Sequence, residues 1–336
     1  MAKIAINGIG RIGKLVLRAL ISDGVDADIV LLNDVSGTPE QHALLLEFDT
    51  VHGRWPAGFS FDQESVSING ERIRMTSEAH IKDLPLEKLG VDLVIDCTGA
   101  FRTDLALQPY YTAGVEKVLV SAPVKDARAL NLVYGVNHDL YDTKVHDLIT
   151  AASCTTNCLA PIVKVMHEEI GIQHGSITTI HNITNTQTIV DRPAKDMRRA
   201  RSALNSLIPT STGSATAITM IYPELKGRLN GHAVRVPVLN GSLTDCVFEM
   251  KRPTTVDEVN ALFKAAAAGP LHGILGYEER PLVSADYTND NRSSIIDGPS
   301  TMVINETQVK IYAWYDNEWG YAQRTADIVR MILKDL

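Results

Sequence analysis

The sequence predicts an α/β protein of two domains: a first domain built on a parallel sheet, and a second, α+β domain with a mixed or antiparallel sheet. The chain has 336 residues, more than one hydrophobic core usually holds. Its first half alternates short apolar runs with a helical pattern, and its second half carries longer runs in which polar residues partly alternate. We expect the first domain to cover residues 1–153 and the second residues 154–319, with a last helix at about 320–336 that packs back on the first domain.

Four short runs in the first half are rich in Val, Ile and Leu with almost no polar alternation, as is typical of a parallel sheet covered on both faces. Between the first two runs, Arg11–Ser22 has apolar residues at helical spacing. A strand, a helix and a second strand in such close succession make a βαβ unit with a right-handed crossover. The expected strands are Lys3–Asn7, Asp28–Asp34, Leu93–Thr98 and Lys117–Ala122.

The runs of the second half predict a sheet with one wetter face, because polar residues partly alternate along them. The expected strands are Ser176–Asn182, Ala233–Met250 and Val309–Tyr315. Helical spacing predicts further helices over Asp257–Ala267, roughly 201–222 and about 320–336. No Pro/Gly-rich linker separates the halves, so the domain boundary rests on the change of pattern.

The composition, with 45% apolar and 21% charged residues, is that of a soluble globular protein. The net charge of −8 argues against nucleic acid as a main partner, because phosphate backbones need a basic face. The four cysteines favour a reducing compartment over a disulfide scaffold. No run approaches the roughly 20 apolar residues of a membrane span, and the strand at Lys3 leaves no room for a targeting peptide. We therefore expect a cytoplasmic protein with no membrane partner.

The stretch GIGRIG at 8–13 matches the dinucleotide-binding pattern G-x-G-x-x-G, and Asp34 ends the strand that follows. Gly8 permits the tight turn, Gly10 lets a pyrophosphate approach the backbone, and Gly13 lets the helix pack on the sheet. The N–H groups at the helix start would bind the phosphates. Asp34 would accept hydrogen bonds from the adenosine ribose and repel a 2′-phosphate, so the expected cofactor is NAD rather than NADP.

Two later residues, Thr98 and Ser121, stand at strand ends where such sheets hold their cofactor. Polar residues are common at strand ends, so either residue alone is a weak indication. The alternative to the whole pattern is a glycine-rich turn with an ordinary acidic strand end. The strand–turn–helix context favours the dinucleotide site and a Rossmann-type first domain.

Cys154 lies where a strand gives way to a helix, and the dipole of a helix N-terminus gives a cysteine thiolate character. Ser153 is a candidate N-cap. His181, at the end of an apolar strand, is placed to take the thiol proton, and such a pair supports attack on a carbonyl carbon. The alternative is an inert, buried cysteine and an unrelated member of the ten histidines. Cys158 follows at i+4, but no further ligand pair stands nearby, so we expect core packing there and no metal site.

Eight stretches carry a resemblance to a known family: INGIGRIG (6–13), FDTVHGR (48–54), SAPVKD (121–126), ASCTTNCLAP (152–161), KDMRRARSALNSLIP (195–209), STG (211–213), PELKGRLNGHAVRVP (223–237) and WYDNEWGY (314–321). With them the chain resembles the glyceraldehyde-3-phosphate dehydrogenases over essentially its whole length. ASCTTNCLAP in register with WYDNEWGY is hard to obtain otherwise.

The resemblance implies an NAD-dependent oxidation of D-glyceraldehyde 3-phosphate that yields 1,3-bisphosphoglycerate. Cys154 would attack the aldehyde to give a thiohemiacetal, and His181 would accept the thiol proton and assist the oxidation. Hydride would pass to the nicotinamide and leave a thioester. Inorganic phosphate would then attack the thioester and release the product.

The resemblance also implies binding residues. Thr184 and Arg235 would hold the C3 phosphate of the substrate, and Asn317 would orient the nicotinamide amide. Residues 182–205 look like the long loop that lines a neighbouring subunit's cofactor site, which implies a homotetramer. Arg11 and Ile12 would contact the pyrophosphate. The attacking phosphate would be held by Ser153, Thr155, Arg199, Thr212 and Gly213.

The chain departs from the family pattern in three places. SEAHIKD, around Ala79, lacks an Arg that many members carry there. Arg192 precedes Pro193 where NAD-specific bacterial members often have Leu, and a cation there would weaken the preference for NAD over NADP. The stretch HNITNTQ (181–187) also differs from housekeeping members. The chain looks somewhat like the variants associated with arsenate resistance, in which arsenate replaces phosphate and gives 1-arseno-3-phosphoglycerate.

Three other functions compete with this interpretation. An erythrose-4-phosphate dehydrogenase would use the same cysteine and fold, although the phosphate-site motifs favour the triose. A non-catalytic NAD-binding regulatory protein would have no need of both Cys154 and His181. A Cys–His hydrolase would have no use for the dinucleotide fingerprint.

Overall fold

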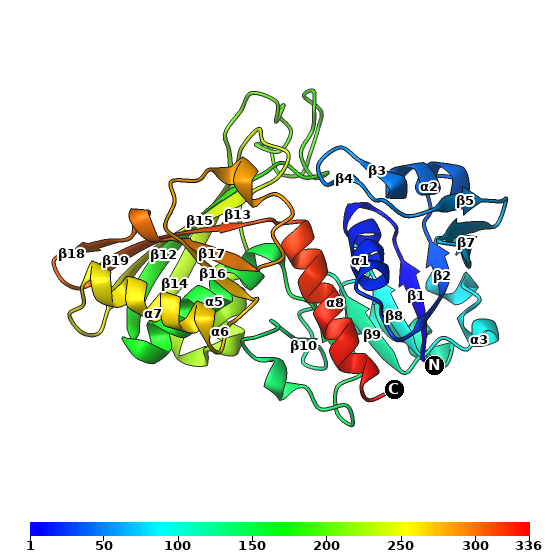
Figure 1. Ribbon diagram of the computed structural model, residues 1–336, viewed down its shortest axis with the longest axis horizontal. Helices are drawn as coiled ribbons and strands as arrows, with labels where there is room; N and C mark the ends of the chain where they lie inside the picture. Colours follow the sequence, from blue (N-terminus) through cyan, green and yellow to red (C-terminus); the bar gives the residue numbers. More distant parts are fainter. The chain divides into compact units, whose positions relative to one another are not determined.

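The computed structural model describes all 336 residues, and the chain divides into two compact units (Figure 1). Unit 1 comprises Met1–Tyr134, His138–Ser153 and Ala322–Leu336, and unit 2 comprises Gly135–Asn137 and Cys154–Tyr321. No helix in either unit combines the length and the hydrophobicity that a membrane crossing requires.

Unit 1 contains the first eleven strands and four helices: β1 (Lys3–Asn7), α1 (Arg11–Ser22), β2 (Asp28–Asn33), α2 (Pro39–Glu47), β3 (Phe48–Asp49), β4 (Gly53–Arg54), β5 (Phe59–Phe61), β6 (Ser65–Ile68), β7 (Glu71–Thr76), α3 (Leu86–Leu89), β8 (Leu93–Asp96), α4 (Asp104–Thr112), β9 (Lys117–Val120), β10 (Leu130–Asn131) and β11 (Leu148–Thr150). Nine of these strands form one sheet in the order β10-β11-β9-β8-β1-β2-β7-β6-β5. The sheet is parallel from β10 to β7, and β5 and β6 add an antiparallel edge. The expected, mostly parallel first sheet is confirmed.

The core of unit 1 forms because the central strands are apolar on both faces. All residues of β8 and β9 are buried, as are four of the five in β1. Helix α1 buries Leu15, Val16 and Leu20 on one face, as the helical spacing predicts. The carboxyl ends of β9, β8, β1 and β2 therefore line up along one edge of a rigid sheet.

Unit 2 contains the remaining elements: α5 (Cys154–Glu169), β12 (Ile172–His181), β13 (Ile208–Ser211), α6 (Ser214–Ile221), β14 (Leu229–Arg235), β15 (Ser242–Met250), α7 (Val256–Ala268), β16 (Leu275–Glu278), β17 (Ser294–Asp297), β18 (Met302–Ile304), β19 (Gln308–Tyr315) and α8 (Trp319–Leu333), whose residues from Ala322 belong to unit 1. The eight-stranded sheet runs β13-β14-β12-β15-β19-β17-β16, and β18 pairs with β19. It is mixed, with parallel pairs β12–β14 and β16–β17 among antiparallel ones. The expected mixed sheet is confirmed.

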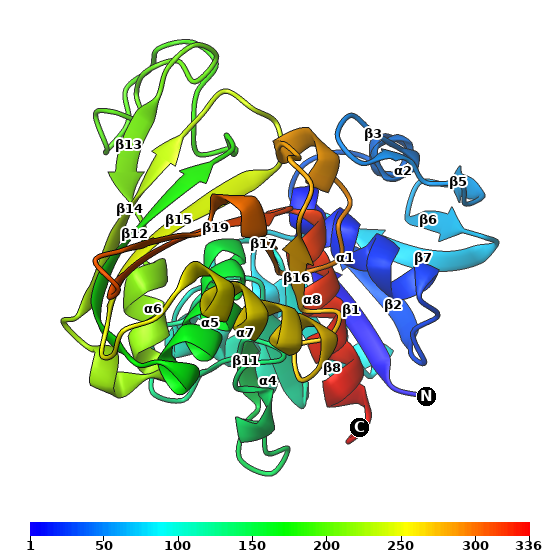
Figure 2. The same cartoon turned by 60° about the vertical axis from the view of Figure 1, so that its left-hand side comes forward.

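One face of the unit 2 sheet is covered by α5, α6 and α7 (Figure 2). Along β15 the residues alternate strictly between buried and half-buried, and β19 follows the same alternation. The buried set faces the helices, and the half-buried set lies on the face that α5, α6 and α7 leave open. The segment between β12 and β13 forms long loops beyond the strand ends (Figure 2).

Two expected elements of the second half are wrong. Ala233–Met250 is not one strand, because the chain leaves the sheet after Arg235 and returns at Ser242. Pro237 has no N–H to donate to a ladder, and Gly241 has a φ of 79°. The helix expected over roughly 201–222 is limited to α6, and β13 takes the place of its first half, since Pro209 interrupts a helix but is tolerated on an edge strand.

Candidate active site

The loop after β1 has glycine wherever a side chain would collide. Gly8 has a φ of 92°, and a Cβ on it would lie 2.6 Å from the backbone nitrogen of Thr98. A Cβ on Gly13 would lie 2.0 Å from the carbonyl oxygen of Gly8. Gly10 differs, because a Cβ there would meet nothing within 4 Å. The loop is therefore pressed against β8 and α1 but open above Gly10.

Helix α1 begins at this opening, and no side chain caps its N-terminus. Its first turn also contains no acidic residue. A helix N-terminus of this kind attracts a phosphate group through its N–H groups and its dipole. The open space above Gly10 and the uncapped helix fit the pyrophosphate of a dinucleotide.

Three polar residues follow the neighbouring strand ends at the same edge. Asp34 comes directly after β2, and its Oδ1 accepts a hydrogen bond from the Ser36 N–H at 3.0 Å. Thr98 follows β8, and Ser121 follows β9. Since β9, β8, β1 and β2 are adjacent in the sheet, the structure brings the predicted dinucleotide residues of unit 1 to one edge.

The predicted Thr98 is fixed by a buried polar network that the sequence did not indicate. Asp96 is fully buried and accepts hydrogen bonds from the Thr98 N–H at 3.0 Å and hydroxyl at 2.7 Å. Tyr110 donates to Asp96 at 2.8 Å and accepts from Asn7 at 2.6 Å. Asn33 donates to Asn7 at 2.7 Å. The network ties the ends of β1, β2 and β8 together beneath the loop.

Arg11 contacts Asp49 rather than projecting freely. Its guanidinium pairs with both carboxylate oxygens of Asp49, which also accepts from the N–H groups of Val51 and His52 at 2.8 and 2.9 Å. Burial raises the pKa of Asp49, but the bonds from Arg11 and the two backbone N–H groups outweigh it and leave the pKa below its usual value. The side chain of Arg11 therefore holds the β3–β4 segment, and its backbone and that of Ile12 remain at the start of α1.

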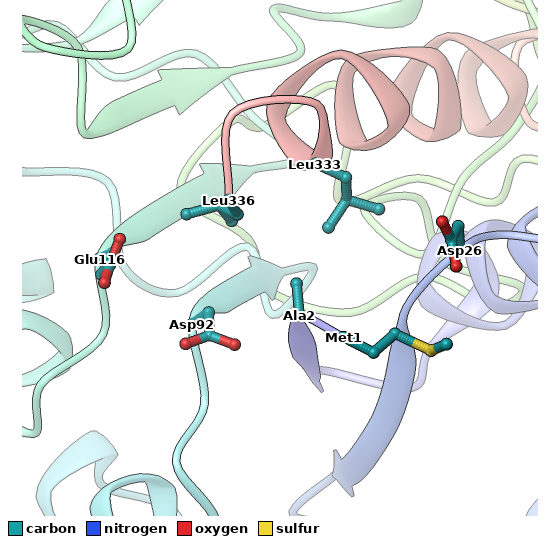
Figure 3. Close-up of a pocket in the computed structure, with 7 residues that line it drawn as sticks. All are labelled: Met1, Ala2, Asp26, Asp92, Glu116, Leu333 and Leu336. Carbon is teal, nitrogen blue, oxygen red and sulfur yellow. The ribbon is translucent and has the colours of Figure 1, made fainter.

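A hollow of about 470 Å³ lies at the opposite edge of the same sheet, beside the starts of β1, β2, β8 and β9 (Figure 3). Its lining includes the carboxylates of Asp26, Asp92 and Glu116 and no Lys, Arg or His side chain. An anionic cofactor would be repelled there. This hollow is therefore not the dinucleotide site.

The second group of predicted residues surrounds Cys154, the first residue of α5. The chain turns sharply between β11 and α5, and Ala152 adopts a left-handed φ of 51°, which is uncommon for a residue with a Cβ. The Sγ atom of Cys154 lies 3.5 Å from Nε2 of His181, at the end of β12. The predicted nucleophile and the predicted base are thus within reach of each other.

Strand pairing brings Arg235 to the other side of the imidazole. His181 and Arg235 are direct partners in the parallel β12–β14 pair. Nδ1 of His181 lies 2.9 Å from the carbonyl oxygen of Asn182 and 2.6 Å from Nη1 of Arg235. The guanidinium also donates to the same carbonyl at 3.1 Å. The ring is thereby held with Nε2 toward Cys154.

The electrostatics of the pair favour two neutral groups. Burial raises the pKa of the Cys154 thiol, and the Arg235 guanidinium and hydrogen bonds at Thr155 offset only part of that effect. Burial, followed by the charge of Arg235, lowers the pKa of His181 to about 3. Burial therefore opposes the thiolate character that the sequence predicts from the helix N-terminus.

Tyr315 belongs to this group, although sequence reasoning assigned it no role. Its hydroxyl lies 3.0 Å from the hydroxyl of Thr155 and 2.7 Å from that of Thr179. Its ring meets the ring of His181 edge-on, with centroids 6.0 Å apart. The motif WYDNEWGY contains this tyrosine, but its contact with Thr155 joins residues 160 positions apart.

Some predicted phosphate residues lie near this group, and others do not contact it. Arg199 donates to Thr210 on β13 at 3.0 Å, and its charge reaches Arg235, whose pKa it helps to lower after burial. Thr184 hydrogen-bonds within its own loop, to Thr186 and Gln187. Three residues lie close along the chain to elements of the site: Ser153 precedes Cys154, and Thr212 and Gly213 precede α6.

The other cysteines pack in the interior, and no group of three or more His, Cys, Asp or Glu side chains forms a metal site. Cys158 and Cys246 are fully buried, and burial raises the pKa of both thiols. Cys97 is half-buried, and burial raises its pKa to about 12. Cys154 alone among the four faces an imidazole nitrogen.

Known protein families match both units. Residues 2–104 match the NAD binding domain of glyceraldehyde 3-phosphate dehydrogenase, and residues 153–317 match its C-terminal domain. The chain belongs to the glyceraldehyde-3-phosphate dehydrogenase family. This membership confirms the expected dehydrogenase class and NAD cofactor.

Members of the glyceraldehyde-3-phosphate dehydrogenase family are similar over the whole chain. Glyceraldehyde-3-phosphate dehydrogenase 3 of Nostoc sp. is 59% identical over 335 residues, 99% of either chain. Glyceraldehyde-3-phosphate dehydrogenase 1 of Bacillus cereus is 48% identical over 328 residues, 98% of this chain and 97% of the relative. The enzyme of Geobacillus stearothermophilus is 48% identical over 330 residues, 98% of both.

Proposed function

We propose that this chain oxidises D-glyceraldehyde 3-phosphate with NAD and inorganic phosphate, and that Cys154 is the nucleophile and His181 its base. The observation that carries the proposal is the 3.5 Å approach of Sγ to Nε2 in a chain that matches the dehydrogenase family over nearly its full length. Unit 1 would hold the cofactor, and unit 2 would carry the chemistry.

The residues of unit 1 fit NAD. Gly8 and Gly13 leave no room for side chains, Gly10 leaves the start of α1 open, and Asp34 stands at the end of β2 for the adenosine ribose. NAD supplies the hydride acceptor. Thr98, held by Asp96, and Ser121 complete the edge that faces the dinucleotide.

The chemistry begins from a neutral thiol and a neutral imidazole. As the sulfur forms a bond to the aldehyde carbon, the thiol proton moves to Nε2 of His181 and then to the aldehyde oxygen, which gives a thiohemiacetal. The thiohemiacetal carbon loses hydride, its hydroxyl proton passes to His181, and a thioester remains on Cys154. A phosphate oxygen then attacks the thioester carbonyl, the C–S bond breaks, the proton on His181 returns to the sulfur, and the acyl phosphate product leaves.

The oxyanions require cationic and hydroxyl groups near the sulfur. We assign Arg235 and Thr184 to the C3 phosphate of the substrate. Arg235 lies against His181, and the charge of Arg199 reaches Arg235, which supports an anion site beside the catalytic pair. The attacking ion would use Ser153, Thr155, Arg199, Thr212 and Gly213. Asn317, after the end of β19, would bind the nicotinamide amide.

Arsenate is a second candidate for the attacking oxyanion, because it is nearly isosteric with phosphate and offers the same acceptor oxygens. The product would then be 1-arseno-3-phosphoglycerate. The departure of HNITNTQ (181–187) from housekeeping members is the observation that favours it. A strong preference for phosphate in kinetics would reject this candidate.

The assembly we propose is a homotetramer. One face of the unit 2 sheet has no covering helix in that unit, and the 183–207 loop carries several exposed apolar side chains. Exposed apolar side chains concentrated on one loop are typical of an interface between subunits. The side chains are Ile189, Val190, Met197, Leu204 and Leu207.

The test of the function is steady-state NADH formation from glyceraldehyde 3-phosphate and NAD, with phosphate and arsenate supplied separately. We expect activity that falls by at least about a thousandfold in Cys154→Ser, because a serine hydroxyl is a much weaker nucleophile here. Erythrose 4-phosphate in a parallel assay tests the longer aldehyde. Folded, NAD-binding protein that forms no NADH from either aldehyde would overturn the proposal.

A further inference from the structure

A fully buried hydroxyl connects the residue after the base to the residue assigned to the nicotinamide. Ser242 is 0% exposed and opens β15. It lies between two strand ends of the same sheet: Leu243 pairs with Ile180 on β12, and Ser242 itself pairs with Tyr315 on β19. The hydroxyl therefore stands beside both His181 and the segment that carries Asn317.

The direction of the two hydrogen bonds at Ser242 is fixed. The backbone N–H of Asn182 donates to Oγ of Ser242 at 3.3 Å, so Oγ is an acceptor toward β12. Oγ lies 2.9 Å from Oδ1 of Asn317, and an amide oxygen only accepts. The single hydroxyl proton of Ser242 must therefore point to Asn317.

This bond decides which end of the Asn317 amide is free. Oδ1 is occupied by Ser242, and Nδ2 has no hydrogen-bond partner within the protein. The neighbouring Asp316 accepts hydrogen bonds from the N–H groups of Glu318 and Trp319 at 2.9 and 2.7 Å and from Nδ2 of Asn240 at 2.8 Å. In this orientation the Ser242 hydroxyl donates to Oδ1, and Nδ2 is left as the donor at the other end of the amide.

We propose that Ser242 is a positioning residue that holds the Asn317 amide with its N–H donors outward, toward the carbonyl of the nicotinamide carboxamide. The inference rests on the assignment of Asn317 to the nicotinamide in the proposed function. Through Asn182, the same hydroxyl ties this orientation to the backbone that carries His181. The amide is thereby set before NAD binds, which reduces the cost of ordering it in the complex.

Binding of NAD is compared with binding of ADP-ribose, which lacks the nicotinamide, by calorimetry on the full chain. For Ser242→Ala we expect the Kd of NAD to rise about tenfold, the value of one net hydrogen bond, and the Kd of ADP-ribose to stay unchanged. Ser242→Thr keeps the hydroxyl and should restore NAD affinity. Ser294→Ala is the matched control, because Ser294 is also 0% exposed but contacts Cys158 instead of Asn317.

The direction of the bond is tested with the 3-acetylpyridine analogue of NAD, which keeps the carbonyl and lacks the amide N–H groups. A donating Asn317 predicts that Ser242→Ala weakens this analogue as much as NAD. If Ser242→Ala left the Kd of the analogue unchanged, the orientation we infer would be overturned. A second variant, Asn317→Ala, should also raise the Kd of NAD and leave the Kd of ADP-ribose unchanged. Combining it with Ser242→Ala should raise the Kd of NAD no further.

Equal weakening of NAD and ADP-ribose in Ser242→Ala, or unchanged affinity for both, would overturn the inference. These outcomes differ from a failure of the proposed function, in which the wild type binds both nucleotides normally but forms no NADH. If Ser242→Ala does not fold, Ser242→Cys takes its place, because a thiol has similar size but is a weak hydrogen-bond donor. It should also raise the Kd of NAD and leave that of ADP-ribose unchanged, and an unchanged Kd for NAD would then overturn the inference.

Discussion

Proton transfer between Cys154 and His181 is costly because burial disfavours the charged form of each group. Burial raises the pKa of the thiol, and burial together with Arg235 lowers the pKa of the imidazole to about 3. Forming thiolate and imidazolium would place two charges in a desolvated site. The transfer is therefore favoured when it accompanies bond formation to the aldehyde, and the charge of Arg235, which contacts His181, acts on the Cys154 thiol.

Alkylation of Cys154 by iodoacetamide tests this electrostatic account at the level of one residue. Only the thiolate reacts, and a raised pKa means that its fraction grows throughout the neutral range. In cofactor-free protein we expect the rate to rise about tenfold per unit between about pH 6 and pH 8. A rate that is level below neutral pH would instead reveal a thiolate–imidazolium pair. Cys154→Ser is the control for reaction at the other cysteines.

Residue-scale prediction from the sequence worked where the chemistry is local. GIGRIG places its glycines within six consecutive positions, so their geometry follows from the strand and helix on either side. The contacts of His181 are different. Its partners Cys154 and Arg235 stand 27 and 54 positions away, and only the register of β12 with β14 shows that Arg235 faces the imidazole. A tertiary contact of this kind leaves no signal in composition or spacing.

At the scale of elements, the start of α1 is the feature on which cofactor binding depends. The helix is pressed against the turn after β1, and its N-terminus is uncapped. Two glycines in this turn serve different purposes. Gly13 provides contact between helix and turn, whereas Gly10 provides space for a ligand.

Two alanine substitutions separate those purposes. Gly13→Ala sets a Cβ 2.0 Å from the carbonyl oxygen of Gly8, so α1 must shift, and we expect a loss of about 2–3 kcal/mol in unfolding free energy. Gly10 has a φ of −74° and open space around it. Gly10→Ala should therefore melt like the wild type and bind NAD more weakly. Chemical denaturation measures the unfolding free energy, and calorimetry measures the affinity for NAD. If both variants lost the same stability and the same affinity, the separate roles of Gly13 and Gly10 would be contradicted.

Elements were predictable from the sequence when their pattern was uninterrupted. The bounds of β1 and α1 agree with the expected Lys3–Asn7 and Arg11–Ser22, because a buried strand and an amphipathic helix follow from the residues themselves. The predicted strand 233–250 and helix 201–222 were wrong, because tertiary contacts determine the secondary structure of these segments. Arg235 and Ser242 lie in separate strands, and β13 exists only because β14 offers an edge to pair with.

At the scale of the whole molecule, the uncovered face of the unit 2 sheet and the apolar 183–207 loop point to other copies of the chain. Val190 and Met197 are 72% and 84% exposed. Single exposed apolar residues are ordinary. Several such residues on one loop expose apolar surface to water unfavourably unless a partner covers them.

Light scattering after size exclusion tests the assembly. We expect the wild type to have four times the mass of one chain, and Val190→Asp combined with Met197→Asp to shift it to smaller species, since buried unpaired carboxylates oppose association. Leu105→Asp is the control, because Leu105 is 82% exposed but belongs to α4 of unit 1 and not to the loop. A wild type that runs as a single chain, or a control that dissociates equally, would contradict the proposed interface.

The central claim, that Cys154 forms a thioester and phosphate releases it, is tested most directly by a burst experiment. Wild-type protein is mixed with glyceraldehyde 3-phosphate and NAD in the absence of phosphate and arsenate. We expect about one NADH per chain, then a near stop, and renewed turnover when either oxyanion is added. Cys154→Ser should give no burst. A burst of equal size in Cys154→Ser, or none in folded, NAD-binding wild type, would contradict the claim.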